Sequence, residues 1–153
     1  MDRRSALTLS QYVERRNGVP LGGRGALSNM VSRSLGADTF SGFWRYWNPI
    51  WGYYLGRYVN VPLRRVLPPP LALVGTFAVS GAIHDSAILV VTGRPTLLLT
   101  SWFTVLGLAV VLLSRFGVRY RFDTWAARAF VNVSILAVSY AIALVARSSL
   151  GLP

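Results

Sequence analysis

The sequence predicts an all-α membrane protein with about three transmembrane helices and one interfacial amphipathic helix. Hydrophobic residues make up 53% of its 153 residues and charged residues only 14%, a balance that is typical of membrane proteins. The apolar residues are also concentrated in three runs of 18 to 21 residues. Each run is close to the roughly 20 residues that a helix needs to cross a bilayer.

Residues 1–39 are predicted to form an Arg-rich cytoplasmic segment that lies on the membrane or on the rest of the fold. Glycine and proline punctuate the stretch RRNGVPLGGRG from Arg15 to Gly25, which indicates a turn or an extended region. Short helices are expected on either side, at about residues 10–15 and 25–35. Residues 40–153 then form a single membrane domain, because the chain is too short for two independent cores.

Residues 40–67 are predicted to form the interfacial helix. Aromatic residues recur there at steps of three or four, which places them on one helical stripe: Trp44, Trp47, Trp51, Tyr54 and Tyr58. Trp and Tyr favour the headgroup level, where the ring is buried and the polar atom stays hydrated. Pro49 predicts a helix start or a kink near Asn48, and prolines 62 and 68–70 end the element.

Three membrane spans follow, at about residues 71–91, 96–113 and 129–146. Ten arginines precede the first span, one lies in the first loop, four lie in the second loop and one follows the last span. An inside N-terminus puts 14 of them on the cytoplasmic side and 2 outside. The positive-inside rule therefore predicts an N-in, C-out orientation. We expect a multi-pass protein of a bacterial plasma membrane.

The net charge of +11 comes from arginine alone, since all 16 basic residues are Arg. In so apolar a chain this charge indicates contact with anionic lipids rather than nucleic-acid binding. The chain has no Cys, which excludes disulfides and thiolate chemistry. Neither a phosphate-binding P-loop motif nor zinc-type ligand spacing is present, so no metal site is predicted.

His84 is the only histidine, and Asp85 follows it inside the first span. Ionisable groups at membrane depth cost roughly 2.5–3.5 kcal/mol per charge, so they indicate a functional site by default. Ser80 and Gly81 lie one turn earlier on the same helix face as His84. Gly81 would allow the close approach of a helix or an acyl chain. A structural role for His84, as a hydrogen-bonding group between helices, is the alternative.

Asp85 is expected to point about 100° away from His84 around the helix. Its carboxylate is therefore predicted to pair with an arginine, such as Arg45 or Arg57, rather than to orient the imidazole.

Two motifs in this order resemble the membrane-bound O-acyltransferase family. The first is Phe-Trp-Arg-Tyr-Trp-Asn-Pro at residues 43–49, and the second is Phe-Ala-Val-Ser-Gly-Ala-Ile-His-Asp at residues 77–85. In that family an F-W-x-x-W-[NH] motif precedes a transmembrane S-G-x-x-H motif by a few dozen residues. Here Asn48 and His84 are 36 positions apart. The likeness is closest to the branch of wax synthases and of sterol and diacylglycerol acyltransferases, and it covers about residues 38–92.

The resemblance implies a membrane-embedded acyltransferase that moves an acyl group from acyl-CoA to a lipid-like alcohol. His84 would be the general base, since a neutral imidazole accepts a proton near pH 7. Asn48 would position the substrate or stabilise the oxyanion through its amide. Acyl-CoA is expected as a substrate, with no bound cofactor. The remaining motif residues would bind substrate: Trp44, Arg45, Trp47, Ser80, Gly81 and Asp85.

The number of spans departs from the family, whose members typically have eight or more around a tunnel. Three spans and one interfacial helix cannot enclose a coenzyme and an acyl chain alone. We therefore expect a homo-oligomer or a companion membrane chain that supplies the missing walls. The alternative function is a non-catalytic, degenerate subunit that packs against a larger partner.

Overall fold

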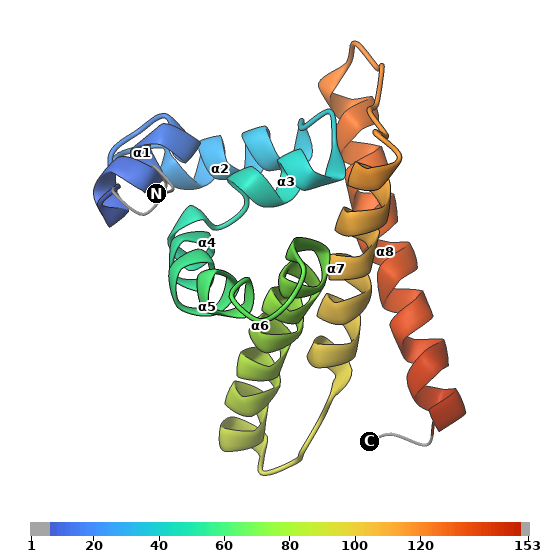
Figure 1. The fold of residues 1–153 in the computed structure, drawn as a ribbon. Helices are drawn as coiled ribbons and strands as arrows, with labels where there is room; N and C mark the ends of the chain where they lie inside the picture. The colour runs from blue at the N-terminus through green and yellow to red at the C-terminus, as the bar shows by residue number, and fades with distance from the viewer. Residues whose placement is uncertain (1–6, 151–153) are drawn as a thin grey trace.

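The computed structural model describes residues 7–150, and over this range it contains helices and no strand. Residues 1–6 of the predicted cytoplasmic segment and residues 151–153 lie outside this range. Three long helices run side by side, and a group of short N-terminal helices covers one end of them (Figure 1). The predicted all-α fold class is therefore confirmed.

Three helices are long and apolar enough to cross a membrane, as predicted. They are α6 (Pro69–Thr92), α7 (Leu98–Arg115) and α8 (Trp125–Leu150). Helix α6 begins at Pro69 because the fixed φ of proline suits a first turn, and it ends where Gly93 adopts φ +67°. Helix α8 starts four residues before its predicted span, because its first turn is not part of the apolar run.

Small residues bring α6 and α7 close together at two levels. A Cβ added to Gly81 would meet the Leu99 carbonyl oxygen and would lie 2.6 Å from the Thr100 Cα. A Cβ added to Gly107 would lie 3.1 Å from the Val74 Cα. Each glycine therefore allows the backbone of the other helix to approach, as is usual where helices pack in lipid.

The segment 40–67 is helical as predicted, but it is interrupted once. Its elements are α3 (Phe40–Tyr46) and then a continuous run of α4 (Pro49–Leu55), a π-helical turn (Gly56–Asn60) and α5 (Val61–Leu63). The break falls at Asn48, which has φ +41°. Pro49 disfavours helical geometry at the residue before it, so α4 restarts in a new direction. The aromatic residues consequently do not form one continuous stripe.

The N-terminal segment contains α1 (Leu9–Asn17) and α2 (Ala26–Leu35), close to the two predicted short helices. It is attached to the start of α8 by hydrogen bonds from two side chains. The Trp125 indole N–H donates to the Ser32 carbonyl at 2.9 Å. The Asn132 amide, which is fully buried, donates to the Leu35 and Ala37 carbonyls at 2.9 and 3.0 Å.

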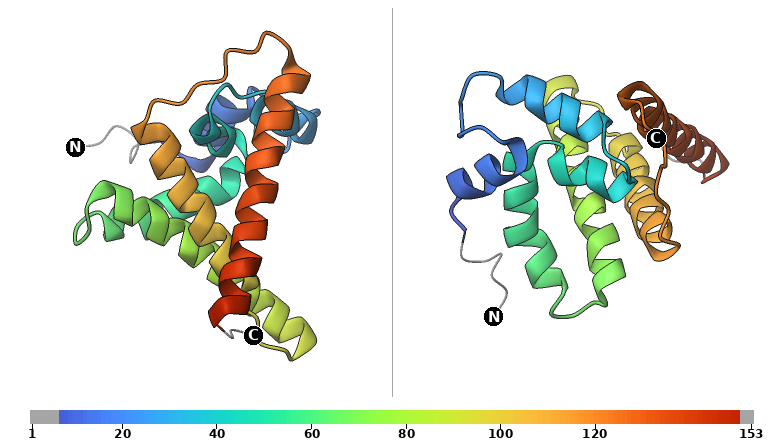
Figure 2. Two further views of the ribbon diagram at one scale, coloured as in Figure 1. Left: turned by 90° about the vertical axis from the view of Figure 1, so that its right-hand side faces the viewer. Right: turned by 90° about the horizontal axis from the view of Figure 1, so that it is seen from above.

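The buried core lies where this segment meets the spans. Phe40 and Phe43 of α3 are almost completely buried against Leu106 and Val110 of α7. Figure 2 shows α8 running the length of the molecule next to α7, with the loop 116–124 at the same end as α2 and α3. The N-terminal helices and this loop therefore share one end of the bundle, and the loop 93–97 lies at the other. This arrangement is compatible with the positive-inside prediction, and the orientation itself stays a prediction.

Candidate active site

His84 lies on α6, one turn after Ser80, with one ring nitrogen engaged by the backbone. Its Nδ1 is 2.6 Å from the Ser80 carbonyl oxygen. A carbonyl oxygen only accepts hydrogen bonds, so Nδ1 must carry the hydrogen and donate it. The neutral ring then has its free lone pair on Nε2. Within residues 7–150, Nε2 has no hydrogen-bond partner, so it is available to accept a proton.

Two aromatic rings from other helices fix the position of the imidazole. The Trp51 ring of α4 packs edge-on to it, with ring centroids 5.9 Å apart, and Phe103 of α7 lies at 5.3 Å. The Trp51 indole N–H also donates to the Ser80 hydroxyl at 2.9 Å. Three elements of the fold therefore converge on His84. The sequence placed Trp51 only in an anchor stripe, and it gave no signal for Phe103.

Asn48 lies at the break between α3 and α4 and caps α4. Its Oδ1 accepts a hydrogen bond from the Trp51 backbone N–H at 3.2 Å, which stabilises the first turn. Since the carbonyl side is held in this way, the amide NH₂ remains available, and it has no partner among the described residues. No hydrogen bond joins Asn48 to His84 in that range. Trp51 connects them instead, because it contacts both.

Asp85 is buried, with 4% of its surface exposed, and it holds the start of α7. One carboxylate oxygen accepts from the Leu99 N–H at 3.1 Å, and the other accepts from the Thr100 N–H and hydroxyl at 2.7 and 2.6 Å. These N–H groups have no partner within α7. The predicted pairing with Arg45 or Arg57 is wrong, because the backbone of α7 occupies the carboxylate.

The other predicted site residues fall into three groups. Ser80 and Gly81 are buried between α6 and its neighbours, so they shape the surroundings of His84. Trp44 packs against Phe77 at 4.9 Å between ring centroids and belongs to the margin of the core. Arg45 and Trp47 are exposed on the last turn of α3 and just after it. The structure thus does not bring all of the predicted residues to one place.

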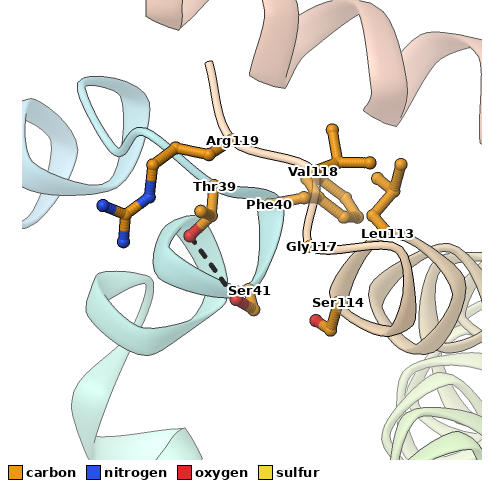
Figure 3. A pocket seen from close by; sticks show the side chains of 8 residues that line it. All are labelled: Thr39, Phe40, Ser41, Leu113, Ser114, Gly117, Val118 and Arg119. Carbon is orange, nitrogen blue, oxygen red and sulfur yellow. Dashed lines mark hydrogen bonds between the residues drawn. The ribbon is translucent and has the colours of Figure 1, made fainter. Parts of the chain in front are cut away.

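His84 itself lies on an exposed surface of the chain. Two cavities occur elsewhere, at the end of the bundle formed by the N-terminal helices. One, of about 200 Å³, lies between the start of α3 and the end of α7 (Figure 3). Its wall includes Leu113, which is ten residues beyond Phe103 on α7 and so about 15 Å further along the helix. His84 is in the wall of neither of these two cavities.

A comparison with known protein families identifies the class of protein to which the chain belongs. The family model of the membrane-bound O-acyltransferases matches residues 27–150. The chain therefore belongs to the membrane-bound O-acyltransferase family, and with three apolar helices it is a membrane protein. No curated protein matches the chain, and no solved structure does.

Proposed function

We propose that this protein transfers an acyl group from acyl-CoA to a lipid-like hydroxyl, with His84 as general base. The observation that supports this most directly is the state of the imidazole. Its Nδ1–H is fixed on the Ser80 carbonyl, and its Nε2 has no hydrogen-bond partner among residues 7–150, on a side chain that is exposed. A base must be able to reach the proton that it removes, and Nε2 can.

The proposed reaction uses groups of this chain at each proton transfer. Nε2 removes the proton of the acceptor hydroxyl as that oxygen attacks the thioester carbonyl. The tetrahedral intermediate then expels the coenzyme A thiolate, which takes the proton back from the imidazolium. Hydrogen bonding of Nδ1–H to the Ser80 carbonyl stabilises the imidazolium while it exists. The free amide of Asn48 is suited to donate to the oxyanion or to position the substrate.

We propose that a second chain closes the site around His84. His84 is exposed, and at most 22% of the residues in any of the three spans are buried. At a site open to water, the thioester of acyl-CoA would be hydrolysed instead of being transferred. A second copy of the chain or a companion membrane chain would supply the other wall. From the two motifs we further infer that the chain is related to the branch of wax synthases and of sterol and diacylglycerol acyltransferases. We also infer that it resides in a bacterial plasma membrane.

The test is release of free coenzyme A by the purified protein in nanodiscs. Long-chain acyl-CoA is supplied with a pool of lipid alcohols, and wild type is compared with His84→Ala and His84→Gln. We expect both variants to lose about 100-fold or more in rate, because general-base catalysis contributes roughly 10²–10⁴. Ser86→Ala is the matched control, since Ser86 is exposed on the same helix and donates only to the Ala82 carbonyl.

Equal rates in wild type and both His84 variants would contradict the assignment of the base. Absence of release from a folded wild type, alone and after pull-down with its membrane partners, would favour the non-catalytic subunit.

A further inference from the structure

The second cavity lies at the start of α8, away from His84, and it is rich in arginine. Its volume is about 340 Å³. It lies between α2, the turn that follows α2, and the first turn of α8. Its wall includes Ser32, Arg33, Asp38, Tyr46, Trp125 and Arg128.

Arg128 is the residue in this wall that most clearly lacks a partner. Its Nε is shielded from solvent and has no hydrogen-bond partner, and the guanidinium forms no ion pair within the part of the chain that the structure describes. Arg128 also stands in the first turn of α8, which contains no acidic residue. A helix N-terminus is the positive end of the helix dipole, where a cation is unfavourable and an anion is stabilised. The surroundings of Arg128 therefore favour an anion.

The other charges of the wall strengthen this positive potential. Arg33 donates one N–H to the Arg16 carbonyl at 2.9 Å and lies 6.0 Å from the Tyr46 ring centroid. Its other guanidinium N–H groups have no hydrogen-bond partner within residues 7–150. Asp38 is the acidic residue of the wall, and Arg119 pairs with its carboxylate at 3.3 Å. This exposed ion pair offsets part of the negative charge of Asp38, and with Arg33 and Arg128 in the wall the net charge facing the cavity is positive.

We propose that this cavity binds a phosphate ester. Guanidinium groups bind phosphate oxygens through paired N–H donors, and Arg33 and Arg128 approach the cavity from two different helices. Trp125 and Tyr46 border it, and such aromatic side chains favour the headgroup level of a membrane. The ligand is therefore either a phospholipid headgroup or a phosphate group of a soluble molecule such as coenzyme A. This binding site does not depend on acyl transfer at His84.

Calorimetric titration of the protein of residues 1–153 in dodecyl maltoside, a phosphate-free detergent, tests the proposal. The two probes are short-chain dihexanoyl phosphatidylglycerol and coenzyme A, each added separately. We expect Arg128→Gln and Arg33→Gln each to raise the Kd of the bound probe by about 10-fold, the effect of a lost charge-assisted hydrogen bond. Arg121→Gln removes the same charge from an exposed residue of the loop 116–124 and should change the Kd less than 2-fold.

The probe whose Kd rises in Arg128→Gln and Arg33→Gln, but not in Arg121→Gln, identifies the source of the phosphate. Arg128→Lys keeps the charge without the paired donors, so it should give an intermediate Kd and serves as the test if Arg128→Gln fails to fold. His84→Gln should bind the probe normally, which separates this proposal from the proposed catalytic function. Equal weakening by Arg121→Gln and Arg128→Gln, or no binding of either probe to folded wild type, would overturn the proposal.

Discussion

His84 and Asp85 are adjacent in the sequence, but their side chains meet different surroundings. Successive residues point about 100° apart around a helix. His84 consequently lies on an exposed surface of α6 beside Trp51, and Asp85 is directed into the contact with α7. His84 therefore keeps an exposed ring, whereas the Asp85 carboxylate joins α6 to the start of α7.

We predict that Asp85→Asn lowers the free energy of unfolding by about 2 kcal/mol, because the amide keeps one acceptor oxygen and its NH₂ group faces an N–H donor of α7 that is left without an acceptor. The loss should be measured by unfolding in mixed detergent micelles. Asp123→Asn makes the same chemical change at an exposed residue of the loop 116–124 and should cost less than about 1 kcal/mol, the usual contribution of a surface charge near a helix N-terminus. An unchanged unfolding free energy in Asp85→Asn would show that the carboxylate does not stabilise the start of α7.

Tyr120 provides a pH-dependent prediction outside the spans. Burial, followed by the nearby charge of Asp38, raises the pKa of Tyr120 to about 12 from 10.0. The folded state thus keeps a proton that the unfolded state loses near pH 10. Tyr120 contributes its full stabilisation below pH 10, and the contribution is lost as the pH rises towards 12.

We therefore predict that Tyr120→Phe is less sensitive than wild type to alkaline pH. At neutral pH this substitution should lower the stability only slightly, because the Tyr120 hydroxyl has no hydrogen-bond partner in the described structure. Melting temperatures at pH 8, 10 and 11.5 would measure the difference, with Tyr58→Phe, an exposed tyrosine, as control. If the melting temperatures of wild type and Tyr120→Phe fall equally as the pH rises, the expected difference in alkaline sensitivity is contradicted.

At the scale of elements, the contact between α6 and α7 positions the candidate site. Gly81 lets the start of α7 approach α6 closely enough for Asp85 to reach the backbone of Thr100. The same approach places Phe103 of α7 against the ring of His84. The geometry around the imidazole therefore depends on a glycine that does not touch it.

Gly81→Ala should consequently separate the two helices and cost about 2 kcal/mol or more of stability, since overpacking typically costs 1–3 kcal/mol. Gly75→Ala is the matched control on α6, because its Cβ would meet only the flexible end of the Leu63 side chain, at 3.1 Å. Unfolding in mixed micelles and the rate of coenzyme A release would both be recorded. Similar stabilities for the two variants would argue against close packing at Gly81.

At the scale of the whole molecule, the N-terminal helices and the loop 116–124 form one end. The Tyr120 N–H donates to the Asp38 carbonyl at 2.8 Å, and Asn132 joins α8 to the end of α2. Both arginine-rich parts of the sequence therefore lie on the same side of the spans. This is the arrangement that the positive-inside rule requires.

The absence of Cys from the sequence makes the orientation directly measurable. Arg94→Cys places a thiol in the loop 93–97, and Asp123→Cys places one in the opposite loop. With an impermeant maleimide added to intact spheroplasts, we expect labelling of Arg94→Cys, and of Asp123→Cys only after permeabilisation. The reverse pattern would invert the predicted N-in, C-out topology.

The sequence by itself determined the number and approximate position of the spans, since apolar runs of about 20 residues in lipid must satisfy their backbone groups as helices. It also determined the family, through residues that are close to one another in each motif. Pro49 also indicated the interruption at Asn48, but the sequence did not reveal the π-helical turn at Gly56–Asn60.

Tertiary structure decided which groups meet. Trp51 and Ser80 are 29 positions apart, and Asp85 and Thr100 are 15 apart. Periodicity assigns a residue to a face of its own helix, but it does not say which carbonyl or N–H of another helix that face will contact. The packing of Trp51 against His84, the burial of Asp85 and the arginine-lined cavity at α8 all depend on such contacts, and only the packed helices supply them.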